Sequence, residues 1–165
     1  MRKTKYFLRT FIVYPYTNLL EETMSNLQTF DVTGIFLLAL IIGGMFFFAA
    51  IMTPLVFTKL PPEISGPFIR EAFPVYSQVM AGMTLAAVLF LWSFSERVYL
   101  ISVFILFVLA WLWLMPLINR YRDDQLKGNE KAGKTFNFLH RLSVVVNLAQ
   151  MGAIGFVLYK VVTHT

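Results

Sequence analysis

The sequence contains no cysteine and little charge, and both shortages limit what the protein can be. Without cysteine there is no disulfide, no thiolate metal site, no covalently attached haem of the Cys-x-x-Cys-His type and no cysteine nucleophile. Charged residues make up 14 % of the chain, against roughly 25 % in soluble proteins. Hydrophobic residues make up 58 %. Both departures point to lipid rather than water as the surrounding medium.

Four long stretches of the chain lack Asp, Glu, Lys and Arg altogether. They are Val32–Thr58, Ala72–Ser95, Val98–Asn119 and Leu142–Tyr159, and the shortest has 18 residues. A helix rises about 1.5 Å per residue and a hydrocarbon core is about 30 Å thick, so each stretch is long enough to cross a bilayer. The sequence therefore predicts an all-α, integral membrane, antiparallel four-helix bundle.

The length of 165 residues leaves room for one domain. We expect a tail over residues 1–31 and a transmembrane domain over residues 32–162, with spans at about 33–58, 73–94, 98–118 and 142–161. In the tail, aromatic and basic residues alternate, which predicts amphipathic segments at the membrane interface. Residues 120–134 are polar, and we expect them to contain the one long loop. The fourth helix should begin before its apolar part, near Asn129 or Lys131, because Phe136, Leu139 and His140 already follow helical spacing.

The net charge of +5 is carried by the tail and by the segments between the predicted helices. Cations there meet lipid phosphates, so we expect the lipid bilayer as a partner and no nucleic acid. The connections after the first and third helices hold eight Lys and Arg residues, and the opposite side holds Arg97 and Lys160 close to the spans. Four more basic residues of the tail lie on that opposite side, but beyond the range where the positive-inside rule is strong. We expect these two connections to face the cytoplasm, in a multi-pass protein of a bacterial inner membrane.

The fourth predicted helix carries a polar stripe. His140, Ser143, Asn147 and Gln150 are spaced by 3, 4 and 3 residues, which places them on one face of a helix. Polar side chains in hydrocarbon turn toward partners, so the stripe should face the other helices. It either fixes the bundle through hydrogen bonds between helices or lines a path for a ligand or an ion.

His140 lies at the membrane edge, with Asp123 and Asp124 of the preceding segment within reach. It has either a structural role or a role in ligand binding or proton transfer. The other histidine, His164, is roughly 35 Å away along the same helix, so the two cannot share a metal ion within one protomer. Arg120, Arg122 and the two aspartates form either a solvated ion-pair cluster or a site for an anion or lipid headgroup.

Two further patterns concern packing and chemistry. Small residues four apart predict points of close helix approach, at Ala39 with Gly43, Gly82 with Ala86, and Ala149 with Ala153. No H-E-x-x-H, Gly-rich phosphate loop or G-x-S-x-G motif is present, and no carboxylate lies in the middle of a predicted span. We therefore expect no catalytic residue, no cofactor and no metal site.

Several short motifs occur in a recognisable order. They are Pro54-x-x-Phe57, Phe73-Pro74-x-Tyr76, Asn119-x-x-Arg122-Asp123 and Leu139-His140-x-x-Ser143-x-x-x-Asn147. Together they resemble the transmembrane protein 205-like domain, the domain of unknown function family 4149, over roughly Val32–Tyr159. The family often has a second Tyr after its Phe-Pro-x-Tyr motif, and Ser77 stands there in this chain.

The resemblance implies a small four-helix membrane protein without an established biochemical activity. It also implies a distant similarity to copper-resistance D-type membrane domains and to a membrane protoporphyrinogen oxidase that binds haem. That oxidase relies on a His in an early helix and on a Lys within the membrane. Here the first three predicted helices have no His and the charge-free stretches no Lys, so haem chemistry is not carried over.

These patterns favour a small integral membrane protein of unassigned biochemical role. We expect it to be non-enzymatic and to act as an accessory subunit of a membrane complex, with other membrane subunits or further copies of itself as partners. The alternative is a transporter or binder of a small ligand, metal ion or lipid. Its site would draw on Tyr76, Asn119, Arg122, Asp123, His140, Ser143, Asn147 and Gln150. A haem-linked redox protein is the third interpretation.

Overall fold

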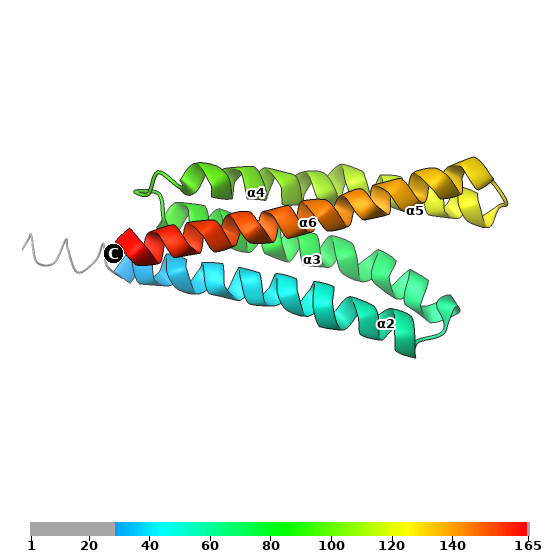
Figure 1. Ribbon diagram of the computed structural model, residues 1–165, viewed down its shortest axis with the longest axis horizontal. Helices are drawn as coiled ribbons and strands as arrows, with labels where there is room; N and C mark the ends of the chain where they lie inside the picture. Colours follow the sequence, from blue (N-terminus) through cyan, green and yellow to red (C-terminus); the bar gives the residue numbers. More distant parts are fainter. Residues whose placement is uncertain (1–28, 165) are drawn as a thin grey trace, which may run out of the picture.

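The computed structural model describes residues 29–164 and shows four long helices that run up and down beside one another (Figure 1). They cover Thr29–Lys59, Pro62–Phe90, Arg97–Leu126 and Glu130–Thr163, and each is long and apolar enough to cross a membrane. No strand occurs in the described range. The predicted all-α four-helix bundle is confirmed, whereas the interfacial segments predicted for the tail lie outside the described residues.

Two of the four helices contain a wider, π-helical stretch. In the first helix, η1 (Phe47–Met52) precedes α2 (Thr53–Lys59). The third helix consists of α4 (Arg97–Leu109), η2 (Ala110–Leu114) and α5 (Met115–Leu126). The second helix is α3 (Pro62–Phe90) and the fourth is α6 (Glu130–His164).

A proline accounts for each π-helical stretch, because η1 and η2 end two residues before Pro54 and Pro116. Proline has no N–H, and its ring pushes against the carbonyl four residues earlier, so the turn widens. The backbone N–H of Thr53 bonds to the carbonyl of Phe48, five residues back, instead of four. The Thr53 hydroxyl donates to the same oxygen at 2.9 Å and so ties the widened turn together.

The helix α3 begins well before the span predicted from residue 73. It starts at Pro62, where a proline removes a donor that the first turn of a helix does not use. Glu63 stands in the first turn, where a carboxylate interacts favourably with the helix dipole. Pro67 and Pro74 are then accommodated inside the helix. The membrane span is thus the inner part of a longer helix.

Residues 120–134 form a helical hairpin, so the prediction of a long polar loop is wrong, whereas the predicted start of the fourth helix near Asn129 or Lys131 is confirmed by α6, which begins at Glu130. Only residues 127–129 are outside α5 and α6. The chain reverses at Gly128, whose φ of 91° suits glycine. Asn129 then caps α6 by accepting a hydrogen bond from the N–H of Ala132 at 3.2 Å. The charges of this segment mark contact with water and headgroups and do not prevent helix formation.

The helices bury a narrow apolar core and leave most of their apolar surface outside. Leu38, Leu100, Phe107 and Ile154 are almost completely buried where the helices meet, and α4 packs against both α3 and α6. In the most apolar 18 residues of each helix, however, only 17–39 % is buried inside the protein. An apolar exterior of this extent suits lipid and not water. The chain is a small multi-pass membrane protein.

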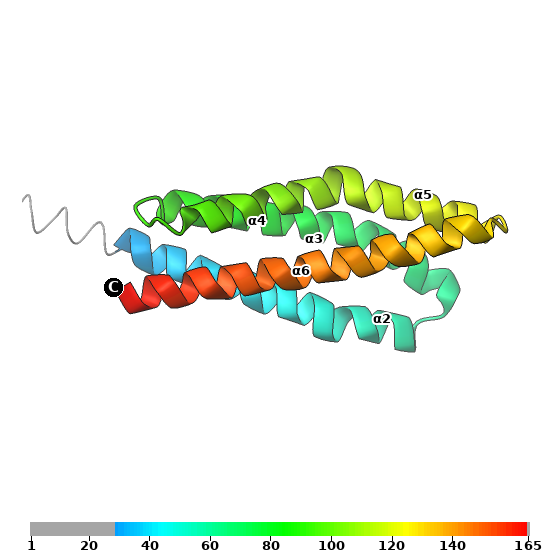
Figure 2. The same cartoon turned by 45° about the horizontal axis from the view of Figure 1, so that its top comes forward.

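The first helix packs closely at one end and diverges at the other. Near its start, the ring of Phe30 lies 5.7 Å from that of Phe90, and a Cβ added to Gly34 would lie 2.5 Å from the side chain of Leu91. Toward the opposite end this helix moves away from α6 (Figures 1 and 2). Among the described helices, α2 packs against α3 alone. The bundle is therefore open on one side along α3.

Candidate functional site

The polar residues of α6 meet polar residues of α3 in the interior of the bundle. We call Tyr76, Ser77, Ser143, Asn147 and Gln150 the interior polar cluster, and all but Asn147 are buried to 9 % exposure or less. On α6 the three cluster residues are four and three positions apart and therefore share one face. That face is turned toward α3 and α4, as the bonds below show.

Two side-chain amides of the cluster link α6 to its neighbours. Asn147 donates from Nδ2 to the hydroxyl oxygen of Tyr76 at 3.0 Å. Gln150 donates from Nε2 to the backbone carbonyl of Val103 in α4 at 3.3 Å. The hydroxyl of Ser143 instead donates within α6, to the carbonyl of His140 at 2.7 Å. The side-chain amides of Asn147 and Gln150 thus link α6 to α3 and to α4.

Ser77 is the exception in this cluster. Its side chain is 1 % exposed, and its hydroxyl has no hydrogen-bond partner among the described residues. It lines a cavity together with Tyr76, Ser143, Asn147 and Gln150. The cavity offers about 10 Å³ to the centre of a water molecule, which is the space of a single water. The interior holds no cavity here that would take a larger ligand.

Aromatic rings surround Tyr76 on several sides. The ring of Phe48 in the first helix stacks on it at 4.4 Å between centroids and 17° between planes. Phe73 and Phe107 approach edge-on, at 5.5 Å and 6.3 Å. Such contacts fix the ring plane and so aim the hydroxyl at Asn147.

Both π-helical stretches adjoin the interior polar cluster. Phe48 belongs to η1, while Ala110 and Leu114 of η2 line the cavity beside Ser77. π-helical turns in proteins are frequent at functional sites, because they displace side chains from the regular helical register. Two of them converge here from different helices, so this level of the bundle is the strongest candidate for a site inside the protein.

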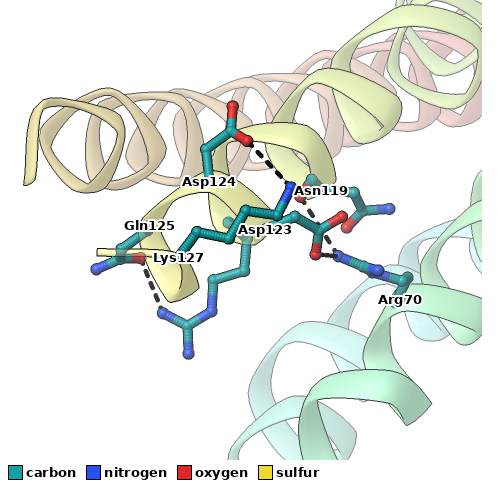
Figure 3. A network of polar contacts seen from close by, with 7 residues as sticks. Arg70, Asn119, Asp123, Asp124, Gln125 and Lys127 are labelled. Carbon is teal, nitrogen blue, oxygen red and sulfur yellow. Dashed lines mark hydrogen bonds and ion pairs between the residues drawn. The ribbon is translucent and has the colours of Figure 1, made fainter. Parts of the chain in front are cut away.

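A second polar group lies at the end of the bundle that carries the α5–α6 hairpin. Arg70 of α3 forms an ion pair with Asp123 of α5 and also donates to the backbone carbonyl of Asn119 at 3.3 Å (Figure 3). Asp124 lies 3.6 Å from the ammonium of Lys127. These contacts connect α3 to α5, and we call this group the hairpin network.

Arg122 and His140 take part in an aromatic column beside the hairpin network. The guanidinium of Arg122 lies 5.2 Å from the centroid of the Phe136 ring and bonds to Gln125 at 2.9 Å. The imidazole of His140 stacks on the same Phe136 ring at 6.0 Å and 16°. His140 is exposed, and the nearby aspartates pair with Arg70 and Lys127 instead of with it.

The residues predicted as one ligand site therefore fall into two groups. Tyr76, Ser143, Asn147 and Gln150 lie in the interior polar cluster, whereas Asn119, Arg122, Asp123 and His140 lie at the hairpin end. Sequence reasoning missed Ser77 and Arg70 as members of these groups. The signal for Ser77 was that it stands where the family often has a second Tyr. Arg70 was counted only as a charge for topology, since its partner is 53 positions away.

Outside the interior there is a larger hollow, which we call the lateral groove. It lies between the first helix and α3, is open to the exterior, and has a volume of about 560 Å³. Tyr76 lines both this groove and the interior cavity. Within residues 29–164 no three His, Asp or Glu side chains lie close enough together to hold a metal ion.

Comparison with known proteins identifies the family. No curated protein and no solved structure matches the chain significantly. Residues 36–127, more than half of the 165-residue chain, match the family described as Domain of unknown function (DUF4149). The match includes Tyr76 and the hairpin network, while the polar residues of α6 lie beyond it. The chain therefore belongs to the DUF4149 family.

Proposed function

We propose that the protein is a non-enzymatic accessory subunit, which associates through its outer surface with other proteins of the same membrane. One observation carries this proposal: the side-chain amides of Asn147 and Gln150 in α6 bond to other helices of the chain, and the space left beside them holds one water. A transporter needs a polar passage wide enough for its cargo, and hydrolytic chemistry needs a nucleophile and a base within reach of a substrate.

The exterior of the protein supports this proposal. Large apolar side chains such as Trp92, Trp113 and Phe138 are more than half exposed. In the membrane such surfaces pack against lipid or against helices of another protein. We also propose that the hairpin end faces the cytoplasm of a bacterial inner membrane, because the connections at that end carry the excess of Lys and Arg.

The test is purification from the native membrane. The tagged chain, produced at its natural level and extracted in mild detergent, should carry one or more proteins in fixed stoichiometry through two successive columns. An untagged strain provides the background. A single monodisperse species that contains this chain alone would contradict the accessory role.

A second function, binding of a small amphipathic ligand, is favoured by the lateral groove. With about 560 Å³ it lies in the range of 300–1,000 Å³ that is typical of small-molecule sites. The interior cavity is far below that range. If the protein binds a ligand, we infer that it does so from the side, within the membrane.

A further inference from the structure

The lateral groove runs lengthwise along one face of α3. Its wall on α3 includes Phe68, Glu71, Val75 and Val79, which follow one another at helical spacing. From Phe68 to Val79 the helix rises by about 16 Å, at about 1.5 Å per residue. The opposite wall belongs to the first helix, around Phe48. The groove thus extends along α3, and it lies parallel to the lipid chains.

The groove is charged at one end only. Glu71 is the charged residue among those that line it. It stands one position before the charge-free stretch Ala72–Ser95, which places the carboxylate near the membrane surface. From Glu71 toward Val79 the α3 wall runs into the apolar part of the membrane. The groove therefore has the polarity of an amphiphile, with one charge at the surface and an apolar body below it.

No neighbouring cation neutralises Glu71 within the described part of the chain. Arg70, the adjacent residue, points toward α5 and pairs with Asp123 (Figure 3). The other ion pair of the described residues joins Lys127 to Asp124. Glu71 is exposed, and its carboxylate is available to a ligand that enters the groove from the lipid.

Four aromatic rings complete the walls: Phe47, Phe48, Phe68 and Tyr76. An ammonium group is attracted both by a carboxylate and by the faces of aromatic rings. We propose that the lateral groove binds a long-chain ammonium amphiphile, with its head at Glu71 and its chain along the aromatic wall of α3. This inference names the ligand class of the second function given above and rests on it.

Other occupants fit the groove less well. A fatty acid would place its carboxylate beside that of Glu71, and the two negative charges would repel each other. An uncharged amphiphile would fill the apolar part of the groove but would leave Glu71 without a counter-charge. A second copy of the chain is the third alternative, since its own basic residues lie at the same end of the helices as Glu71. Light scattering of the purified protein shows whether it is a dimer. These three occupants are distinguished by the test.

The test compares ligands of equal chain length on the full-length protein in micelles of an uncharged maltoside detergent, because phosphatidylcholine is itself an ammonium amphiphile and would compete. We would measure saturation binding of radiolabelled dodecylamine and its competition by unlabelled dodecylamine, dodecanol and dodecanoic acid. The amine should compete at least about tenfold better than the alcohol, because a charge-assisted contact is added to the same chain. The acid should compete worst.

Three variants locate the site. Glu71→Gln keeps the shape and removes the charge, and it should weaken amine binding about tenfold while leaving alcohol binding unchanged. Val75→Trp fills the groove and should abolish binding of all three ligands. Glu63→Gln, on the same helix but outside the groove, is the matched control and should bind like the parent protein. Thermal melting of each variant shows that it is folded.

Each unfavourable result has a distinct meaning. If amine, alcohol and acid bind equally, or if Glu71→Gln binds amine as the parent does, the ammonium class is wrong but a ligand groove remains. If none of the three binds, or if Val75→Trp abolishes a dimer instead, the ligand-binding function itself is wrong. Neither result depends on a partner, so the accessory role is tested separately by native purification.

Discussion

The side-chain amide of Asn147 in α6 donates to the hydroxyl of Tyr76 in α3 across 3.0 Å, joining residues 71 positions apart in the chain. In a bilayer neither group has bulk water as an alternative partner, which favours the bond. Measured bonds of this kind between membrane helices are nevertheless modest, at about 0.6 kcal/mol on average and about 1.7 kcal/mol at most. The bond is therefore better seen as a determinant of helix register than as the main source of stability.

A double-mutant cycle tests this bond. Asn147→Leu and Tyr76→Phe should each lower the free energy of unfolding in detergent, and together they should show a coupling energy of about 0.6–1.7 kcal/mol. Gln78→Leu is the matched control, because Gln78 is an exposed polar residue of the same helix α3. It should leave stability unchanged or raise it. Strictly additive effects of the two single changes would mean that the bond does not form.

Close packing of the first helix on α3 is tested by two glycines of the same helix. A Cβ at Gly34 would lie 2.5 Å from Leu91, whereas a Cβ at Gly43 would meet nothing within 4 Å. Gly34→Ala should therefore destabilise the protein by about 1–3 kcal/mol, as overpacking does. Gly43→Ala should be neutral or slightly stabilising, because alanine is the better helix former.

A rescue experiment makes this packing prediction specific. Combining Gly34→Ala with Leu91→Ala removes the side chain that the added methyl group would meet. The double variant should be more stable than the sum of the two single losses predicts. Equal melting temperatures for Gly34→Ala and Gly43→Ala would show that the first helix does not approach α3 at this point.

The ion pair between Arg70 and Asp123 should contribute little to stability. The two side chains are 39 % and 45 % exposed, so solvent and salt screen their attraction. A double-mutant cycle with Arg70→Ala and Asp123→Ala should give a coupling energy below about 1 kcal/mol, falling further in high salt. The cycle for Lys127 and Asp124, which are 3.6 Å apart, should give a smaller value still. A larger coupling for the second pair would reverse this ranking.

Membrane orientation is open to a labelling experiment, because the chain has no cysteine of its own. Lys127→Cys places a thiol at the α5–α6 hairpin, and Ser93→Cys places one in the connection between α3 and α4. If the basic hairpin end faces the cytoplasm, an impermeant maleimide added to intact cells should label Ser93→Cys alone. Lys127→Cys should react only after the membrane is permeabilised, and the opposite pattern would invert the topology.

Much of the fold follows from where charges are absent. Charge-free runs of 18 residues or more have few alternatives to crossing a bilayer, so the four helices and their alternating direction could be predicted. The start of the fourth helix was also predicted, but most other helix ends were not. Residues 120–134 looked like a loop because they are charged, yet only residues 127–129 leave the helices. Charge reports the environment of a residue, and backbone conformation follows from propensity and capping.

The contacts between helices were harder to predict than the helices. The spacing of Ala39 and Gly43 suggested a close approach, yet Gly43 faces open space and Gly34 makes the close contact instead. Small residues permit an approach from any side, and the sequence does not say on which side a neighbour lies. The polar stripe of α6 was better defined, because an amide in hydrocarbon has to find a partner. That partner, Tyr76, belongs to a motif far away in the sequence. The sequence predicted it as a site residue but did not predict its hydrogen bond to Asn147.

Tyr76 lines both the lateral groove and the water-sized cavity. Its hydroxyl is also what Asn147 holds. Anything that enters from the lipid and tilts this ring also stretches the contact between the second and fourth helices. A ligand that displaced Tyr76 from the side of the lateral groove would therefore act on α6 through Asn147, although no passage leads through the described part of the bundle.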